Sequence, residues 1–267
     1  MFNFKEYEMK KILLIAILGS WMLMQAHAQK INPSQQTVNS VIWQQHSGEY
    51  KALCYQAFYI AKLSLNDILH TNKDSMPLAI VTDIDETILD NSPDAAHSIL
   101  NNHGYTDTSW KKWVDLAIAE AMPGAKEFFN YAAQYGVQCF YLSNRGIKDL
   151  DATIKNLQLR GFPQADKQHV ILKTTTSDKE PRRLEIAKKY NIVLLLGDNL
   201  NDFDKEFYKK NVADRNAATD KMQSLFGTKY IVLPNSTYGD WENALWPDKR
   251  LNEEEKARIK MQALKGF

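Results

Sequence analysis

The chain has 267 residues, with 33 lysines and arginines against 32 aspartates and glutamates. Its hydrophobic content of 44% is ordinary for a folded globular protein, and the length allows one large domain or two small ones. Because the charge is balanced, composition gives no basis for binding a nucleic-acid polymer or an anionic membrane surface.

The first 28 residues differ in character from the rest. Two lysines precede an apolar run over residues 12–24, and residues 26–28 read Ala-His-Ala, a typical cleavage site. This pattern predicts a secretory signal peptide over residues 1–28, since the run is too short to span a membrane as a helix. We therefore expect an exported protein, periplasmic or secreted.

The mature chain would cover residues 29–267 and carry 30 basic and 30 acidic residues. A lipid anchor needs a cysteine at the cleavage point, where Gln29 stands, so we expect no lipid at that site. The two cysteines, Cys54 and Cys139, could pair in an oxidising compartment. Their apolar surroundings favour two buried free thiols instead.

Before the first strand, the sequence predicts a loose leader and one long helix. Residues 29–40 are polar, whereas apolar residues recur with helical spacing over about residues 48–70. These apolar residues are Leu53, Ala57, Ile60, Ala61, Leu65 and Ile68.

Residues 79–87 carry the most informative pattern. A short apolar run ends in two carboxylates, Asp83 and Asp85. Such a run predicts a buried strand, and ligands bind at the carboxyl ends of strands in open α/β sheets. The aspartates could serve as nucleophile and proton donor, hold a hard cation, or form an acidic turn. A calcium loop is excluded, since Ile88 stands where that loop requires glycine.

Polar side chains also follow the strands predicted over residues 137–142 and 193–196. A hydroxyl, an amide and a guanidinium follow the first, and all three suit phosphate oxygens; two carboxylates four residues apart follow the second. These side chains are Ser143, Asn144, Arg145, Asp198 and Asp202. Between the two strands, Lys179 stands just before a helix that Pro181 is expected to open.

Strands and helices alternate along the chain, which predicts a parallel, doubly wound α/β sheet. Between the first and second motifs, about residues 91–122 should hold two helices. The other predicted helices cover residues 124–136, 150–160, 182–189 and 252–264, and the other strands cover 170–172 and 230–233.

The order of these motifs resembles the haloacid dehalogenase superfamily of phosphohydrolases. More narrowly, residues 83–93 and 197–203 look like the two signatures of class C bacterial acid phosphatases, which include lipoprotein 5'-nucleotidases. Further matches lie at residues 110–113, 123–125, 233–235 and 238–239. The chain departs from the family at Asp94, where tyrosine is usual.

The resemblance implies a Rossmann-type sheet with a small helical cap at about residues 91–122, and a Mg²⁺ cofactor. Asp83 would be the nucleophile that forms an aspartyl-phosphate, and Asp85 the general acid and base. Ser143 and Lys179 would hold the phosphoryl oxygens, although Lys179 could also be a solvated lysine. The implied metal ligands are Asp83, the carbonyl of Asp85, Asp198 and, more weakly or indirectly, Asp202.

The implied substrate is a small phosphate monoester, and first of all a nucleoside monophosphate. Trp110 and Tyr238 match positions that stack on a nucleobase, and Asn144 would contact substrate. The alternative for both rings is hydrophobic packing, which we prefer outright for Trp113. A carboxylate at Asp94 could change substrate preference.

Two other functions stay open. One is a broad-specificity acid phosphatase or phosphotransferase that acts on sugar or aromatic monoesters. The other is a non-catalytic surface binding protein, although such a protein would be expected to lose Asp83. Arg145 and the pair Arg182-Arg183 are expected to be ion-paired or on the surface. The sequence gives no oligomeric state.

Overall fold

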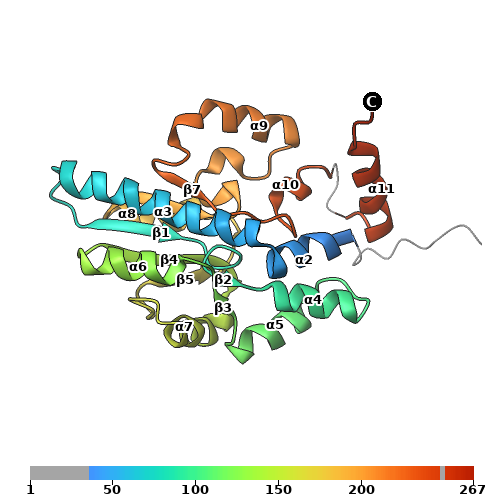
Figure 1. Cartoon of the computed structure of the whole chain (residues 1–267), viewed down its shortest axis with the longest axis horizontal. Helices are drawn as coiled ribbons and strands as arrows, with labels where there is room; N and C mark the ends of the chain where they lie inside the picture. Colours follow the sequence, from blue (N-terminus) through green and yellow to red (C-terminus); the bar gives the residue numbers. More distant parts are fainter. Residues whose placement is uncertain (1–35, 247–249) are drawn as a thin grey trace, which may run out of the picture. The chain divides into compact units, whose positions relative to one another are not determined.

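A five-stranded parallel sheet organises the computed structural model, which describes residues 36–246 and 250–267 (Figure 1). In sheet order the strands are β5 (Val170–Lys173), β4 (Gln138–Gly146), β1 (Leu78–Thr82), β6 (Asn191–Gly197) and β7 (Tyr230–Val232). The first strand thus lies in the middle, with the next two on one side and the last two on the other. This confirms the predicted doubly wound sheet, whose switch point lies at the carboxyl end of β1.

Both faces of the sheet are buried, because side chains alternate between the faces along each strand. On one face the sheet contributes Ile80, Cys139, Tyr141, Leu194, Leu196 and Ile231 to the first core cluster. On the other face it contributes Ala79, Val81, Phe140, Leu142, Leu195 and Tyr230 to the second core cluster. Strands buried on both faces require unbroken apolar runs, which is why the sequence predicts them well.

Cys54 and Cys139 are buried free thiols, as expected.

Helices cover the two faces. The helices α3 (Gly48–Thr71), α6 (Ala125–Gln134) and α7 (Leu150–Leu159) contribute to the first core cluster, and α8 (Glu180–Ala187) contributes to the second. This division follows from right-handed crossovers, because the strand order steps one way after β1 and returns to the other side after β5. The predicted helix over residues 48–70 is confirmed as α3.

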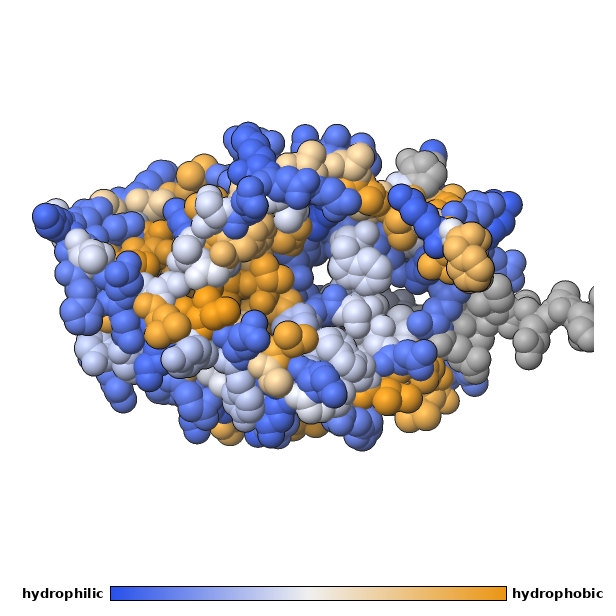
Figure 2. Space-filling model, turned by 45° about the horizontal axis from the view of Figure 1, so that its top comes forward, coloured by the Kyte–Doolittle hydropathy of each residue, from blue (hydrophilic) through white to orange (hydrophobic). Residues whose placement is uncertain are grey.

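The α3 helix is buried along one side only. Its large exposed apolar residues are Leu53, Tyr55, Tyr59 and Leu63. Figure 2 shows apolar side chains gathered on part of an otherwise largely hydrophilic face. The helix therefore covers the sheet with one stripe while its other side faces water.

A small helical insertion lies between β1 and α6. At its base β2 (Leu89–Asp90) pairs antiparallel with β3 (Glu120–Ala121). Between these strands lie α4 (Ser92–Leu100) and α5 (Asp107–Leu116). Two helices were expected within residues 91–122, and two are present; their role as a cap stays a prediction.

The prediction of a loose leader over residues 29–40 is wrong at its end, where α2 (Val38–His46) begins. Val41 of this helix is buried, and Nε2 of Gln44 donates to Oδ1 of Asp90 at 2.8 Å. These tertiary contacts order a segment whose polar sequence carries no clear helical pattern. The predicted signal peptide lies outside the described residues.

Three α-helices follow β6 in the described part of the chain. They are α9 (Val212–Lys221), α10 (Asp240–Asn243) and α11 (Glu253–Ala263). Only α11 was expected, and Asn252 opens it with a capping box. Among residues 36–246 and 250–267, no helix is both long and apolar enough to cross a membrane.

Candidate active site

The first motif begins where β1 ends. The amide of Asp83 donates to the carbonyl of Leu196 at 2.9 Å, so the ladder between β1 and β6 continues to the first aspartate. The chain then turns sharply, with Glu86 at a φ of +56°, a left-handed conformation that is uncommon for a residue with a side chain. The turn leaves Asp83 and Asp85 at the switch point of the sheet.

Three carboxylates meet at this point. Asp83 follows β1, Asp198 and Asp202 follow β6, and one oxygen of each lies within 4.8 Å of the others. Asp202 folds back against Gly197, where an added Cβ would lie 2.7 Å from its Cγ. Asp202 also accepts a hydrogen bond from the amide of Asn199 at 3.1 Å, which fixes its position.

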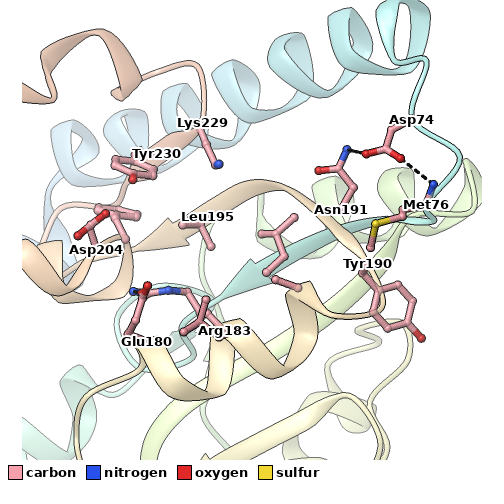
Figure 3. Close-up of a pocket in the computed structure, with 14 residues that line it drawn as sticks. Asp74, Met76, Glu180, Arg183, Tyr190, Asn191, Leu195, Asp204, Lys229 and Tyr230 are labelled. Atoms are coloured by element: carbon pink, nitrogen blue, oxygen red, sulfur yellow. Dashed lines mark hydrogen bonds and ion pairs between the residues drawn. The ribbon is translucent and has the colours of Figure 1, made fainter.

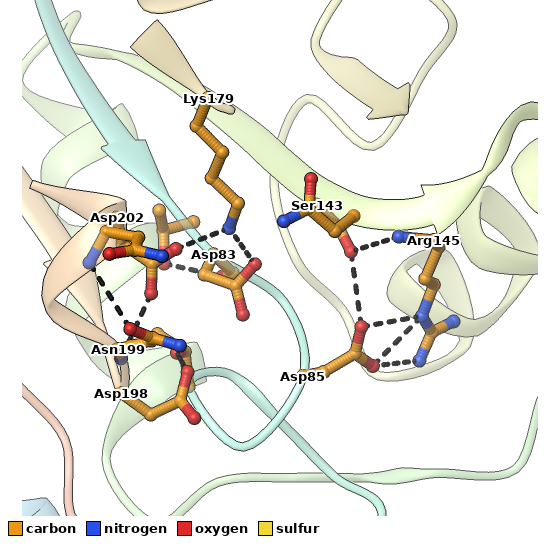
Figure 4. Close-up of polar contacts among 12 residues, drawn as sticks. Asp83, Asp85, Ser143, Arg145, Lys179, Asp198, Asn199 and Asp202 are labelled. Carbon is orange, nitrogen blue, oxygen red and sulfur yellow. Dashed lines mark hydrogen bonds and ion pairs between the residues drawn. The ribbon is translucent and has the colours of Figure 1, made fainter. Parts of the chain in front are cut away.

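Lys179 is buried among these carboxylates (Figure 4). Its Nζ pairs with Asp83 and lies 2.6 Å from Oδ1 of Asp202. Burial raises the pKa of Asp83 to about 7 against the opposing effect of Lys179, and burial raises the pKa of Asp198 well above its usual value. Three carboxylates thus face one ammonium in a poorly solvated site. This excess of negatively charged oxygen ligands suits a divalent cation.

Asp85 lies apart from this cluster and faces β4 (Figure 4). Its Oδ1 lies 2.7 Å from Nη2 of Arg145, and its Oδ2 accepts from Oγ of Ser143 at 3.2 Å. Arg145 is only 3% exposed. The expectation of an ion pair for Arg145 is therefore confirmed, and the surface alternative is wrong.

The two aromatic candidates both have polar neighbours. The ring of Trp110 lies 5.5 Å from the guanidinium carbon of Arg145. The hydroxyl of Tyr238 donates to the carboxylate of Glu86. Trp113, which was expected to be structural, packs against the first core cluster. Base stacking by Trp110 and Tyr238 stays a prediction.

The side chain of Asn144 is held by protein groups. Its Nδ2 donates to the carbonyl of Ser177 at 3.0 Å, and its Oδ1 accepts from Nη2 of Arg182 at 2.7 Å. Arg182 also donates to the carbonyl of Ser143 at 2.7 Å. Asn144 and Arg182 therefore fix the end of β4, and a substrate contact by Asn144 stays a prediction.

Sequence reasoning missed three residues beside the carboxylates. Glu86 is 1% exposed, and burial raises its pKa to about 8. Asn91 donates to Asp85 at 2.9 Å, and Asn235 donates to Asp198 at 2.7 Å. The rule that polar groups at strand ends form the site could have found Asn235, which follows the last strand. Glu86 directly follows Asp85 in the first motif, and the sequence carries no separate signal for its burial.

A separate groove of about 390 Å³ lies along α8, β6 and β7 (Figure 3). Arg183, Leu195 and Tyr230 are among its lining residues, but Asp83 and Asp85 are not. The candidate active site is therefore identified by the converging charged groups around Asp83 and Asp85, and not by this groove. Arg183 is buried and pairs with Glu180, so the ion-paired expectation is confirmed for it too.

Comparison with known proteins agrees with the motifs. The family model of the HAD superfamily, subfamily IIIB (Acid phosphatase), matches residues 7–241. The structure of the Class C acid phosphatase from Bacillus anthracis is 41% identical, with a TM-score of 0.85 over 89% of this chain and 100% of that chain. Its tungstate-bound crystal structure gives the same identity and coverage, with a TM-score of 0.86.

A more distant relative is a stem 31 kDa glycoprotein from Glycine max, which is 25% identical over 183 residues. The match covers 64% of this chain and 66% of the glycoprotein, so the chain spans less than two thirds of that relative's length. The family model matches more than half of the chain, and this establishes the family. The chain belongs to subfamily IIIB of the HAD superfamily, the acid phosphatases, a family of phosphoric monoester hydrolases.

Proposed function

We propose that this chain hydrolyses phosphate monoesters through an aspartyl-phosphate on Asp83, with Mg²⁺ as cofactor. The observation that carries the proposal is the meeting of Asp83, Lys179, Asp198 and Asp202 at the switch point of the sheet. The Bacillus anthracis relative was crystallised with tungstate bound, and tungstate is a tetrahedral oxyanion like phosphate. That structure supports an oxyanion site in this fold.

Asp83 is the proposed nucleophile. A carboxylate oxygen attacks phosphorus, the bond to the leaving oxygen breaks, and the phosphoryl group is held on Asp83. Attack requires the ionised carboxylate, whereas burial alone favours the protonated form. Lys179, paired with Asp83, opposes this effect of burial and favours the charged nucleophile.

Mg²⁺ would be held by Asp83, Asp198 and the carbonyl of Asp85. When bound, it neutralises charge between the carboxylate nucleophile and the phosphate dianion. Asp202 is engaged with Lys179 and with the amide of Asn199. These contacts support the expectation that Asp202 is a weaker or indirect ligand.

Asp85 is the proposed general acid and base. It gives a proton to the leaving alcohol and later takes one from the water that attacks the phosphoryl group on Asp83. Ser143 lies beside Asp85, and its single hydroxyl proton, which is donated to Asp85 here, would turn to a phosphoryl oxygen of the substrate. The amide of Arg145 donates to Oγ of Ser143 at 3.0 Å, which orients the hydroxyl.

Nucleoside monophosphates are the proposed preferred substrates. The ring of Trp110 contacts Arg145, which pairs with Asp85, and the hydroxyl of Tyr238 donates to Glu86, the residue after Asp85. Aromatic rings at such positions can stack on any nucleobase.

A broad-specificity phosphatase or phosphotransferase is the second candidate. It is favoured by the half-buried Asp94 in the first turn of α4, where the family usually has an aromatic residue. The contact between the Trp110 ring and Arg145 also favours the broad-specificity candidate. The non-catalytic alternative is disfavoured, since Asp83 and Lys179 are present and paired.

A substrate panel tests the proposal. Purified protein covering residues 29–267 is assayed with Mg²⁺ on nucleoside monophosphates, sugar phosphates and an aryl phosphate. Metal-dependent turnover with preference for nucleotides is expected. Equal rates on all classes would favour the broad-specificity candidate, and no turnover on any of them would overturn the proposed function.

We also propose that the protein is exported, to the periplasm or the medium. The support is the signal-peptide pattern in residues 1–28. N-terminal sequencing of the protein from cell fractions and medium should give a start near Gln29. An N-terminus that still carries residues upstream of Gln29 in all fractions would contradict export by cleavage.

A further inference from the structure

The carboxylate of Asp85 is surrounded by donors. Nε of Arg145 lies 3.0 Å from Oδ1 and 3.2 Å from Oδ2, and Nη2 lies 2.7 Å from Oδ1. Nδ2 of Asn91 donates to Oδ1 at 2.9 Å, and Oγ of Ser143 donates to Oδ2 at 3.2 Å. The side chain of Asp85 is 16% exposed, so these contacts replace most of its water. Its orientation is therefore set by the protein.

Arg145 is itself fixed on several sides. Its Nη1 donates to Oγ1 of the fully buried Thr153 at 3.1 Å, and its Nη2 lies 3.5 Å from Oδ1 of Asn91. Trp110 covers the guanidinium at 5.5 Å. A planar guanidinium held by several partners at once has little freedom to turn, and lysine cannot reproduce this geometry.

The same network reaches the helical insertion. Nε1 of Trp113 donates to Oδ1 of Asn91 at 2.8 Å, while Trp110 contacts Arg145. Trp110 and Trp113 both belong to α5. The helix α5 of the insertion thus contacts both Asn91 and Arg145, two of the residues that hold Asp85.

We propose that Arg145 is a positioning residue that holds Asp85 where it can protonate the leaving alcohol. The proposal rests on the proposed function and deepens it, because it names the substrates that depend on this arginine. Phosphate esters of weakly acidic alcohols, which include alkyl esters such as nucleoside monophosphates, need a proton on the departing oxygen. Esters of acidic phenols need little help. Arg145 therefore extends the substrate range to alkyl phosphates.

The test compares kcat/KM across leaving groups in the full-length mature protein. This parameter reports the steps up to release of the alcohol, so hydrolysis of the phosphoryl-enzyme, which all substrates share, does not affect it. The series runs from phosphates of acidic phenols through phenyl phosphate to an alkyl phosphate. Arg145→Met should lose about a hundredfold on the alkyl phosphate and less than about threefold on the most activated aryl phosphate. Asp85→Asn should show the same trend.

Arg145→Lys keeps the charge and loses the two-nitrogen contact, so it should lie between wild type and Arg145→Met on the same series. If Arg145→Met does not fold, Arg145→Lys alone provides the test. The matched control is Arg160→Met, directly after α7, because Arg160 donates to the carbonyls of Ala119 at 2.8 Å and Ile118 at 2.6 Å in the same insertion. Any loss in this control should be equal across leaving groups. Thermal unfolding is measured for every variant.

Equal losses on aryl and alkyl phosphates in the Arg145 variants, no loss, or a gain on alkyl phosphates would overturn the role of Arg145. A wild-type protein that turns over no phosphate monoester would instead overturn the proposed function. The two failures are distinguished by the wild-type assay alone.

Discussion

At the scale of single residues, Asp83 is both the proposed nucleophile and a buried carboxylate whose charge is unfavourable for folding. It is 8% exposed and shares the site with two other carboxylates. Asp83→Asn keeps the shape of the side chain and removes its charge, so turnover should fall by at least about a thousandfold. Thermal unfolding near neutral pH should be unchanged or shifted upward, since one of three crowded negative charges is gone. Residual activity within about tenfold of wild type would refute the role as nucleophile.

Tyr238 offers a way to separate a ring from a hydroxyl. Its hydroxyl donates to Glu86, which also accepts from the amide of Asn91 at 2.8 Å. Tyr238→Phe should lower the free energy of unfolding by about 1–3 kcal/mol, because the buried carboxyl group of Glu86 loses one hydrogen-bond donor. The ratio of kcat/KM for a nucleotide to that for a small phosphate should stay unchanged, since the ring remains.

Tyr238→Ala removes the ring as well and is the companion variant. If the ring stacks on the base, this variant should lower the nucleotide ratio by the equivalent of about 1–3 kcal/mol. Trp110→Ala should lower the ratio similarly if it is the second stacking ring. Parallel losses on nucleotides and small phosphates for both alanine variants would leave the broad-specificity candidate standing.

At the scale of elements, the turn after β6 depends on Gly197. Its added Cβ would crowd Asp202, which caps the short turn that follows. Gly197→Ala should therefore destabilise the fold by about 1–3 kcal/mol and displace a carboxylate of the site. The control is Gly48→Ala at the start of α3, where no atom lies within 4 Å of the added Cβ and the helix gains a better helix former. Denaturant unfolding of both variants checks this prediction, and equal stabilities would contradict it.

The elements that the sequence predicted are those whose own residues carry the pattern. The central strands are apolar runs because both faces are buried, and α3 shows helical spacing over many turns. The pattern fails for α2 and α9. Contacts such as the one from Gln44 to Asp90 decide α2, and a polar sequence does not show which distant residue it will meet. Local pattern therefore predicts the sheet and its main covering helices, and tertiary contact decides the rest.

The same division holds for the site across the whole molecule. Asp83, Asp85, Ser143 and Asp198 lie at or just after the carboxyl ends of strands, and the topology of a parallel sheet brings such residues to one edge. Arg145 also lies at the end of β4, yet its burial depends on pairing with Asp85, which lies 60 residues earlier in the chain. A sequence shows the charges but not which of them compensate one another. Buried pairs are therefore the part of the site that sequence reasoning finds last.

The clustered acids also make the stability of the whole fold depend on pH. Burial raises the pKa values of Asp83 to about 7 and Glu86 to about 8, and it raises that of Asp198 well above its usual value. Since these carboxyls bind protons more tightly in the folded than in the unfolded state, their contribution to stability falls as the pH rises through these values. A cation bound by the ionised carboxylates displaces those protons, so its affinity should rise with pH.

Metal removal and pH should therefore act together. EDTA should abolish turnover and Mg²⁺ should restore it, while Mg²⁺ should raise the midpoint of thermal unfolding more at about pH 8 than at about pH 5. Asp198→Asn removes one of the titrating ligands, so the shift caused by Mg²⁺ should shrink and the metal concentration for half-maximal rate should increase. Thermal scans with and without Mg²⁺ at both pH values measure this. An equal shift at both pH values would show that the cation binds without displacing protons from Asp83 and Asp198, and a metal-independent enzyme would remove the cation from the proposed function altogether.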